Sequence, residues 1–329
     1  MAGDRDLAVA FATAWSAEVG HGLSGWEVAA ATGVRGLRLL NESGAFDRFV
    51  LSEANDAAAE VLAQNASRWP GAATEHRDGR SPPPTIPFDY VDIDPYGTPV
   101  PFVPAAFAAL RPGGVLAVTA TDMMVLAGVQ RGACERRYGA HPIRGRLSPE
   151  GGLRILLAYL AREARSRART IRPLLAYVRD HHVRAYVEVA TTTEATSPDP
   201  IRVVDPATWT GPPVGDRGPY GPLWLGPLFD ADLVRRLAPP GAPARARETG
   251  QFIARLQDET SADVPFYYES NRLAGALALT APPALAALLE VLRGRGFRAA
   301  RTHARPEGFR TDAPRATVAL VARSLSTPR

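Results

Sequence analysis

The tetrapeptide Asp94-Pro95-Tyr96-Gly97 carries the side chains best suited to chemistry in this sequence. It follows the apolar run 88–93, which predicts a strand. An exocyclic amine on a base ring is a poor nucleophile because its lone pair is delocalised. A carboxylate and a backbone carbonyl that accept its two N–H bonds favour the pyramidal amine and take up its proton. Asp94 and the Pro95 carbonyl supply these acceptors, and Tyr96 can stack on the base; an ordinary proline turn after a strand is the alternative.

Three further positions follow predicted strands. The turn 32–36, which contains Gly33 and Arg35, lets a ligand approach the backbone, although glycine turns also serve packing alone. Glu53 ends the second strand about 20 residues beyond this turn, where a carboxylate accepts hydrogen bonds from ribose hydroxyls; a cap is the alternative. Asp78, in the loop before the next strand, can accept the amine of adenine or be a plain loop residue. This acidic set, without a complete G-x-G-x-x-G pattern, favours adenosylmethionine over a dinucleotide.

Strands and helices alternate in the first part of the chain. Apolar runs predict strands at 26–31, 46–51, 88–93 and 115–121, and periodic segments predict helices at 7–19, 37–41, 56–65 and 104–110. This alternation is typical of an α/β fold with a parallel, doubly wound, Rossmann-like sheet. Ligands of such sheets bind at the carboxyl ends of the strands, where the residues above are placed.

A smaller α+β unit is expected after the sheet. A long helix is predicted at 153–169 and a strand at 183–190, followed by an irregular stretch and a proline-rich linker at 238–243. Beyond the linker we expect helices near 251–259, 270–279 and 283–293 and strands near 298–303 and 317–323. These features predict domains at 1–237 and 238–329.

The composition excludes several chemistries. The chain has 329 residues, enough for about two domains, and all 38 of its Lys+Arg residues are arginine. Without lysine it cannot form a pyridoxal Schiff base or use a phosphate-loop lysine. Its one cysteine, Cys134, excludes an intramolecular disulfide and is expected to be a packing residue. No apolar run reaches the roughly 18 residues of a membrane span and no leader is recognisable, so we expect a cytoplasmic protein without a membrane partner.

Arginine is concentrated in two regions. Residues 101–190 carry 14 arginines against 6 acidic residues, and residues 261–329 carry 10 against 5. Such regions suggest a polyanionic partner, with solvated helix faces as the alternative. Within the first region, some of the arginines from Arg162 to Arg172 could meet phosphates. The pair His181-His182 lacks metal-ligand spacing and is expected to be structural.

The motifs in combination resemble the tRNA (guanine-26-N2) dimethyltransferases. Each motif alone is unspecific, but the combination is specific and keeps its order nearly from end to end. The matching stretches are 5–7 (RDL), 31–36 (ATGVRG), 92–99 (DIDPYGTP), 116–122 (LAVTATD), 152–156 (GLRIL), 221–228 (GPLWLGPL), 301–303 (RTH) and 311–314 (TDAP).

This resemblance implies a class I methyltransferase domain followed by a C-terminal domain, both contacting tRNA. The implied reaction moves one or two methyl groups from S-adenosylmethionine to N2 of guanine-26, a base that must leave its stack to be reached. Asp94 would be the catalytic carboxylate, with Pro95 beside it, and Tyr96 would stack on the flipped guanine. The residues implied to hold the cofactor are Arg5, Gly33, Arg35, Glu53, Asp78 and Gly79.

The sequence departs from the family pattern in two places, one before Arg5 and one in residues 191–220. Family members carry an aromatic-rich segment before the Arg-Asp-Leu motif, whereas four residues precede Arg5 here, so a second face of the base clamp is not expected from that segment. Many members have a cysteine zinc site before the Gly-Pro-Leu-Trp stretch, but residues 191–220 contain no cysteine, and no metal is expected. Two rival functions stay open: methylation of another amine, such as a small molecule, and tRNA binding without turnover.

Overall fold

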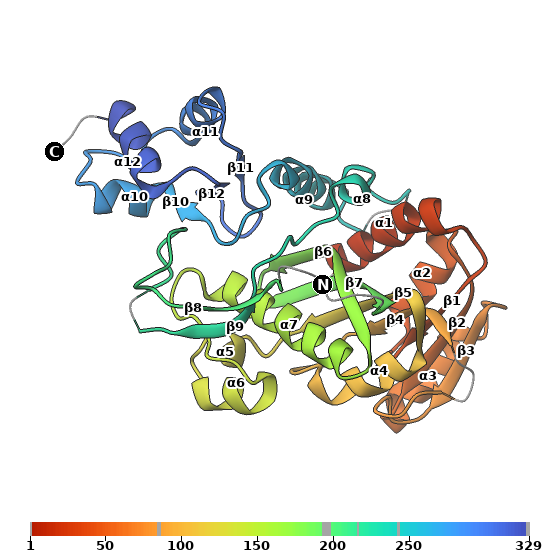
Figure 1. The fold of residues 1–329 in the computed structure, drawn as a ribbon. Helices are drawn as coiled ribbons and strands as arrows, with labels where there is room; N and C mark the ends of the chain where they lie inside the picture. Colours follow the sequence, from red (N-terminus) through yellow and green to blue (C-terminus); the bar gives the residue numbers. More distant parts are fainter. Residues whose placement is uncertain (1, 84–86, 193–198, 216, 242–243, 327–329) are drawn as a thin grey trace.

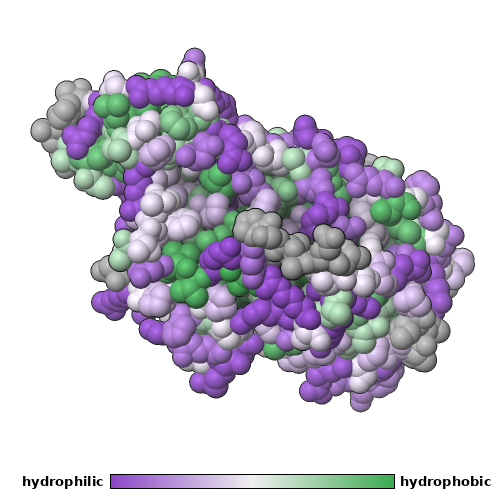
Figure 2. Space-filling view, viewed as in Figure 1, coloured by the Kyte–Doolittle hydropathy of each residue, from purple (hydrophilic) through white to green (hydrophobic). Residues whose placement is uncertain are grey.

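The structure is a computed structural model that describes residues 2–83, 87–192, 199–215, 217–241 and 244–326. Figure 1 shows a body built on one twisted sheet and a lobe of C-terminal residues that stands off it. In the space-filling view of Figure 2 the lobe projects from the body, and hydrophilic and apolar residues are mixed over the visible face.

A seven-stranded sheet forms the centre of the body. Its strand order is β3-β2-β1-β4-β5-β7-β6; β1 to β5 are parallel, and β7 is antiparallel to both of its neighbours. The prediction of a doubly wound α/β sheet is therefore confirmed. The strands are β1 (Leu23–Glu27), β2 (Phe46–Glu53), β3 (Ala72–His76), β4 (Phe88–Ile93), β5 (Leu110–Ala120), β6 (Arg169–Arg179) and β7 (His182–Thr191).

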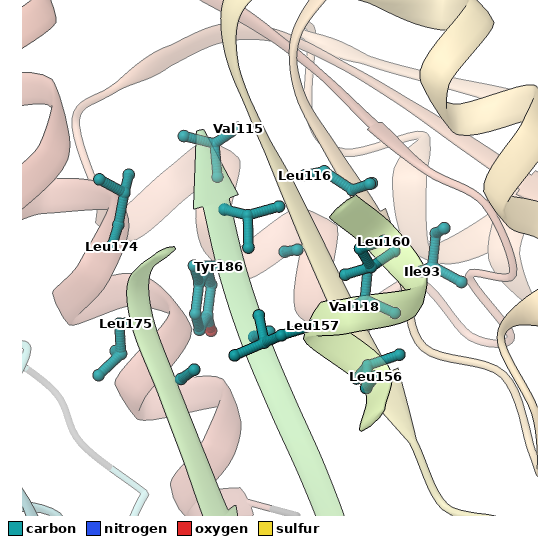
Figure 3. Close-up of a cluster of buried hydrophobic side chains, with 14 of the residues drawn as sticks. Ile93, Val115, Leu116, Val118, Leu156, Leu157, Leu160, Leu174, Leu175 and Tyr186 are labelled. Atoms are coloured by element: carbon teal, nitrogen blue, oxygen red, sulfur yellow. The ribbon is translucent and has the colours of Figure 1, made fainter. Parts of the chain in front are cut away.

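Helices cover both faces of this sheet. Leu156, Leu157 and Leu160 of α7 are fully buried, and Figure 3 shows them directed at strand residues such as Ile93 and Val118. Burying such leucines stabilises the fold by about 1.5–3 kcal/mol per side chain. The helices of the body are α1 (Ala2–Val19), α2 (Val34–Glu42), α3 (Asp56–Ala66), α4 (Val103–Ala109), α5 (Met123–Leu126), α6 (Arg131–Tyr138), α7 (Ser148–Arg165), α8 (Ala231–Arg235) and α9 (Ala246–Glu259), with a 3₁₀ turn at Val100–Phe102.

The C-terminal lobe has a second, smaller buried core. It holds a three-stranded sheet in the order β10-β12-β11, and its buried apolar residues begin at Tyr268. Ile253 and Leu256 of α9 belong to the first core instead, although α9 follows the predicted linker. The remaining elements are β8 (Ile201–Val204), β9 (Tyr220–Trp224), β10 (Tyr268–Glu269), α10 (Ser270–Ala276), α11 (Leu285–Gly294), β11 (Ala299–Arg301), β12 (Gly308–Thr311) and α12 (Arg315–Ser324), with a 3₁₀ turn at Thr260–Ala262.

Some element predictions are wrong. The strand predicted at 317–323 is helix α12, because its buried residues Val318, Val321 and Ala322 follow the helical spacing i, i+3, i+4. No strand was predicted between Glu53 and residue 88, but Ala72–His76 forms β3, a half-exposed edge strand without a clear apolar alternation. Strand β6 was missed because Pro173 interrupts the pattern, and the register shifts between Pro173 and Leu175.

Buried charges join the lobe to the body. Arg310 of β12 is fully buried and donates to Glu150 of α7 at 2.9 Å and to Glu259 of α9. Glu259 also accepts from His303 Nδ1 at 2.6 Å, and the Val178 N–H donates to His303 Nε2 at 2.9 Å. Burial opposes ionisation, but His303 and Arg310 together hold the pKa of Glu259 well below its usual range.

A search of the helices in the described residues finds no segment long and apolar enough to cross a bilayer.

Candidate active site

Asp94 and Arg35 meet at the carboxyl edge of the sheet. Asp94 directly follows β4, and Arg35 lies in the first turn of α2 after the turn that ends β1. The guanidinium donates to Asp94 Oδ2, and the two side chains are 5% and 10% exposed. Within the described residues, Asp94 Oδ1 and Arg35 Nη1 are buried and have no hydrogen-bond partner. Leaving such groups unsatisfied costs about 1–3 kcal/mol each, so the pair is suited to receive a polar ligand.

A second layer of buried charge lies beneath this pair. Asp92 of β4 and Arg184 of β7 are fully buried and form an ion pair of 2.6 Å. Tyr90 donates to Asp92 at 2.7 Å, and Arg184 also donates to Thr119 at 2.6 Å. Burial acts against the charged form, but Arg184 and Arg35 hold the pKa of Asp92 below its usual range. A permanently charged carboxylate therefore lies two residues before Asp94.

Glu27, the last residue of β1, is a buried carboxyl group beside Arg35 that the sequence analysis did not single out. Its Oε2 accepts from the Gly36 N–H at 3.0 Å, and its Oε1 lies 3.9 Å from Arg35 Nε. Burial, together with the charge of Asp92, raises the pKa of Glu27 to about 8. Near neutral pH the group is thus mostly protonated, and the turn after β1 is held by a neutral acid.

Replacing Glu27 by Gln should remove a pH dependence of stability. Folding raises the pKa of Glu27 from its ordinary value of 4.5 to about 8. The protonated form is therefore favoured by folding, and its stabilisation is complete below pH 4.5 and is lost as the pH rises toward 8. We expect the unfolding free energy of the wild type to fall relative to Glu27→Gln by roughly 1.4 kcal/mol per pH unit in this window. Urea unfolding of both proteins at pH 5 and pH 8 measures this change. The same difference in unfolding free energy between the two proteins at both pH values would refute the prediction.

Glu53 contacts the turn after β1. Its Oε2 accepts from the Ala31 N–H at 2.7 Å, and its Oε1 accepts from the N–H groups of Ala54 and Asn55 at 3.0 and 2.9 Å. A carboxylate oxygen accepts more than one hydrogen bond, so Glu53 retains capacity for a ligand hydroxyl. In the same turn Gly33 has φ +78°, a conformation that favours glycine.

Gly79 and Asp78 differ in their surroundings. Gly79 packs against the end of β1 so closely that a Cβ there would lie 2.1 Å from the Val28 carbonyl oxygen. Asp78 is 44% exposed and accepts from Arg80 Nε at 2.7 Å. The structure thus brings the Gly79 backbone to the same turn as Gly33, while the Asp78 carboxylate is paired with its neighbour.

The side chain of Tyr96, two residues after Asp94, projects into solvent. Its side chain is 99% exposed, whereas Pro95 is buried. The following residue is fixed by Thr121, whose Oγ1 accepts from the Gly97 N–H at 2.7 Å and whose N–H donates to the Gly97 carbonyl at 3.0 Å. An exposed aromatic ring on a restrained loop is free to stack on a planar ligand.

Within the described residues, Arg5 forms no hydrogen bond or ion pair with the other predicted site residues. It lies half-buried in α1. The adjacent Asp6 is fully buried and pairs with Arg38 of α2 at 2.7 Å, and it also accepts from the N–H groups of Ala244 and Arg245 before α9. The Arg-Asp-Leu motif therefore has a clear structural role through Asp6.

The weaker candidates are structural. Arg165 pairs with Asp199 and Arg172 with Glu188, and Arg162, Arg167 and Arg169 are bonded within the chain in the same way, so this stretch is largely paired internally. His182 is buried against Asp4 at 3.1 Å. Burial raises the pKa of the Cys134 thiol to about 12, which agrees with a packing role.

The profile of the N2,N2-dimethylguanosine tRNA methyltransferase family matches residues 1–199 and 215–323. The chain belongs to this family. The tRNA (guanine(26)-N(2))-dimethyltransferase of Thermococcus kodakarensis is 39% identical over 250 residues, which cover 72% of this chain and 65% of that protein. The same enzyme of Pyrobaculum arsenaticum is 33% identical over 329 residues, 97% of this chain and 88% of the relative.

A solved structure of the family shares the whole architecture. Trm1 from Pyrococcus horikoshii, in complex with S-adenosyl-L-methionine, superimposes with a TM-score of 0.83 at 26% identity, covering 98% of this chain and 92% of that one. The family resemblance inferred from the motifs is therefore confirmed, and with it the class of fold. In this chain Arg35, Glu53 and Asp94 lie at or just after the strand ends where a doubly wound sheet binds its ligand.

Proposed function

We propose that this chain transfers one or two methyl groups from S-adenosylmethionine to N2 of guanine-26 in tRNA, acting in the cytoplasm. The observation that carries this proposal is the buried carboxylate Asp94, with one oxygen unpaired, placed beside an exposed aromatic ring in a chain of this family. The domain 1–237 would hold the cofactor and the target base, and the domain 238–329 would bind the rest of the tRNA. Helix α9 would link them because it packs on the first core.

The residues at the strand ends fit the cofactor. Arg35 has a buried, unpaired Nη1 that suits a carboxylate, and Glu53 has acceptor capacity for ribose hydroxyls. Because Gly33 and Gly79 have no side chains, a ligand can approach the backbone around the turn after β1. Asp78 could take the adenine amine only if its pair with Arg80 opens, and Arg5 is assigned by the family pattern alone. When bound, the cofactor supplies an electrophilic methyl group on a sulfonium.

Asp94 activates the acceptor amine in this proposal. Asp94 Oδ1 and the Pro95 carbonyl accept the two N–H bonds of guanine N2, which turns the nitrogen lone pair toward the methyl group. As the N–C bond forms, Asp94 takes the proton that N2 releases. Arg35, bonded to Asp94 Oδ2, holds the carboxylate in position. A second transfer needs one N–H, which the monomethylated amine still has.

Tyr96 stabilises the extruded base by stacking. Flipping guanine out of its stack costs a few kcal/mol. Replacing Tyr96 by Ala removes a stack worth about 1–3 kcal/mol, so we expect kcat/KM for tRNA to fall roughly 5- to 150-fold. Because the ring is 99% exposed, the melting temperature should not change. Tyr96→Phe keeps the ring and should keep most of the activity; equal loss in both variants would argue for a role of the hydroxyl instead of stacking.

One assay separates this function from its rivals. The protein is incubated with labelled S-adenosylmethionine and bulk unmodified tRNA, and the RNA is digested to nucleosides. Labelled N2-methylguanosine or its dimethyl form supports the proposal. Label in small molecules of a cell extract, with none in RNA, would favour another amine acceptor. Binding of tRNA or cofactor with no transfer would favour a protein without turnover.

A further inference from the structure

A cavity of about 500 Å³ lies between the body and the C-terminal lobe, away from Asp94. Its body side is the loop 144–147 before α7 and the segment 213–215; its lobe side is β10, α10 and α12. The apolar part of the lining includes Leu147, Leu273 and Leu277. A concave, mostly apolar space of this volume is typical of sites that hold a molecule the size of a nucleotide.

The rim of this cavity is strongly cationic. Four arginines line it, against one acidic residue, Glu269. All four arginines are exposed: Arg144, Arg146, Arg272 and Arg315. The closest contacts of Arg146 and Arg272 to Glu269 are 3.9 and 3.7 Å, which are longer than hydrogen bonds. The positive charge of the rim complements a phosphate-bearing ligand. It offers no such attraction to a neutral apolar partner.

Glu269 is a buried acid in the cavity wall, and its ion pairs are long. Its side chain is 5% exposed; Oε2 lies 3.9 and 3.7 Å from Arg146 and Arg272, and Oε1 lies 3.9 Å from Arg305 Nε. A ligand that enters beside the rim arginines can offer an N–H group to Oε2, and carboxylates accept the exocyclic amines of nucleobases in this way. Tyr268 lies next to it, 8% exposed and stacked on Phe309 at 5.4 Å, so the wall is rigid.

The cavity is at the edge of the molecule where the methyl transfer is proposed. Strand β6 is parallel to β5, because both are antiparallel to β7. Helix α7 leads into the amino end of β6, so α7 begins at the edge where β4 and β5 end. The loop 144–147 immediately precedes α7. A polynucleotide that presents a base to Asp94 can therefore follow this edge toward the lobe.

We propose that this cavity binds one nucleotide of the substrate tRNA outside the target base. The apolar walls hold an unpaired base, Glu269 accepts an N–H from its edge, and the rim arginines contact the adjoining phosphates. This inference rests on the proposed function, since it takes tRNA as the substrate. Binding there would fix the C-terminal lobe against the RNA and position the chain for transfer at Asp94.

Two kinds of variant test the proposal in the full-length protein. Ala276→Trp places an indole in the cavity from an exposed position at the end of α10, with Ala276→Ser as its control. Arg272→Glu reverses a rim charge, and Arg295→Glu makes the same change at an exposed arginine of the lobe outside the cavity. Binding of unmodified tRNA is measured by fluorescence anisotropy at fixed salt, and cofactor binding and melting temperature are measured beside it.

We expect Ala276→Trp and Arg272→Glu each to weaken tRNA binding about tenfold or more, with both controls within about twofold of the wild type. Cofactor affinity should not change. Wild-type tRNA binding by Ala276→Trp would overturn the proposal even if Arg272→Glu is weakened, because surface charge alone would then explain the result. Failure of the proposed function gives a different pattern: wild-type protein that leaves tRNA unmethylated, whatever the cavity variants bind.

Discussion

Replacing Asp94 by Asn should abolish methyl transfer while leaving cofactor binding intact. The amide keeps an acceptor oxygen but cannot take up the proton that the amine releases, so we expect kcat to fall roughly 10²- to 10⁴-fold. The Arg35 guanidinium that Asp94 now holds remains near the charged carboxylate of Asp92, so it does not become an isolated buried charge. Single-turnover transfer to tRNA measures the loss.

One measurement and one control variant show whether Asp94→Asn affects the transfer step alone. Calorimetric titration should give a dissociation constant for S-adenosylmethionine within about threefold of the wild type, because the loss belongs to the transition state. Asp232→Asn is the matched control: it makes the same change in an exposed carboxylate of the body that has no role in the proposed site. Full activity of Asp94→Asn would remove Asp94 from its assigned role.

Replacing Arg310 by Met should destabilise the protein by about 3–5 kcal/mol, because two buried carboxylates lose a shared cation and keep only Arg154 and His303 as partners. Arg310 is fully buried between Glu150 and Glu259, which come from two helices of the body. Its loss should also loosen the lobe, since these pairs connect β12 to α7 and α9. The midpoint of urea unfolding measures the change.

Two control variants distinguish the effect of losing a buried charge from the effect of losing any one charge. Arg298→Met removes an exposed pair with Asp312 in the same lobe, and such pairs contribute less than about 1 kcal/mol. The double variant Glu259→Gln, Arg310→Met removes one buried charge of each sign and leaves Glu150 paired with Arg154, so it should recover part of the lost stability. Equal effects of Arg298→Met and Arg310→Met would contradict the assigned role of the buried network.

The sheet and the reactive strand end were predictable from local sequence. The apolar runs before Glu53 and Asp94 are strands with those residues at or just beyond their ends, as the pattern of apolar residues and turns indicates. The Asp94-Pro95-Tyr96 stretch stands out because its residue types suit amine chemistry whatever the surrounding fold. Long-range pairing does not enter into either inference. The structure confirms the sheet and the position of Asp94 just after a strand, and the chemical role of Asp94 stays a prediction.

The buried charges could not be predicted in this way. Glu27 ends a short strand, and nothing local shows that Asp92 and Arg35 converge on it. The pairing of Arg184 with Asp92 joins residues 92 positions apart, and that of Arg310 with Glu150 joins residues 160 apart. Similarly, the arginines from 162 to 172 have a composition that suits phosphates, but most of their partners come from distant strands and loops.

The central claim is that this chain transfers a methyl group to the exocyclic amine of one guanine in tRNA. Two transcripts of the same tRNA test it most directly, one with guanosine at position 26 and one with inosine, whose base is guanine without the N2 amine. With labelled S-adenosylmethionine, the account predicts label in the guanosine transcript and none in the inosine transcript. Equal label in both, or label in neither, would contradict it.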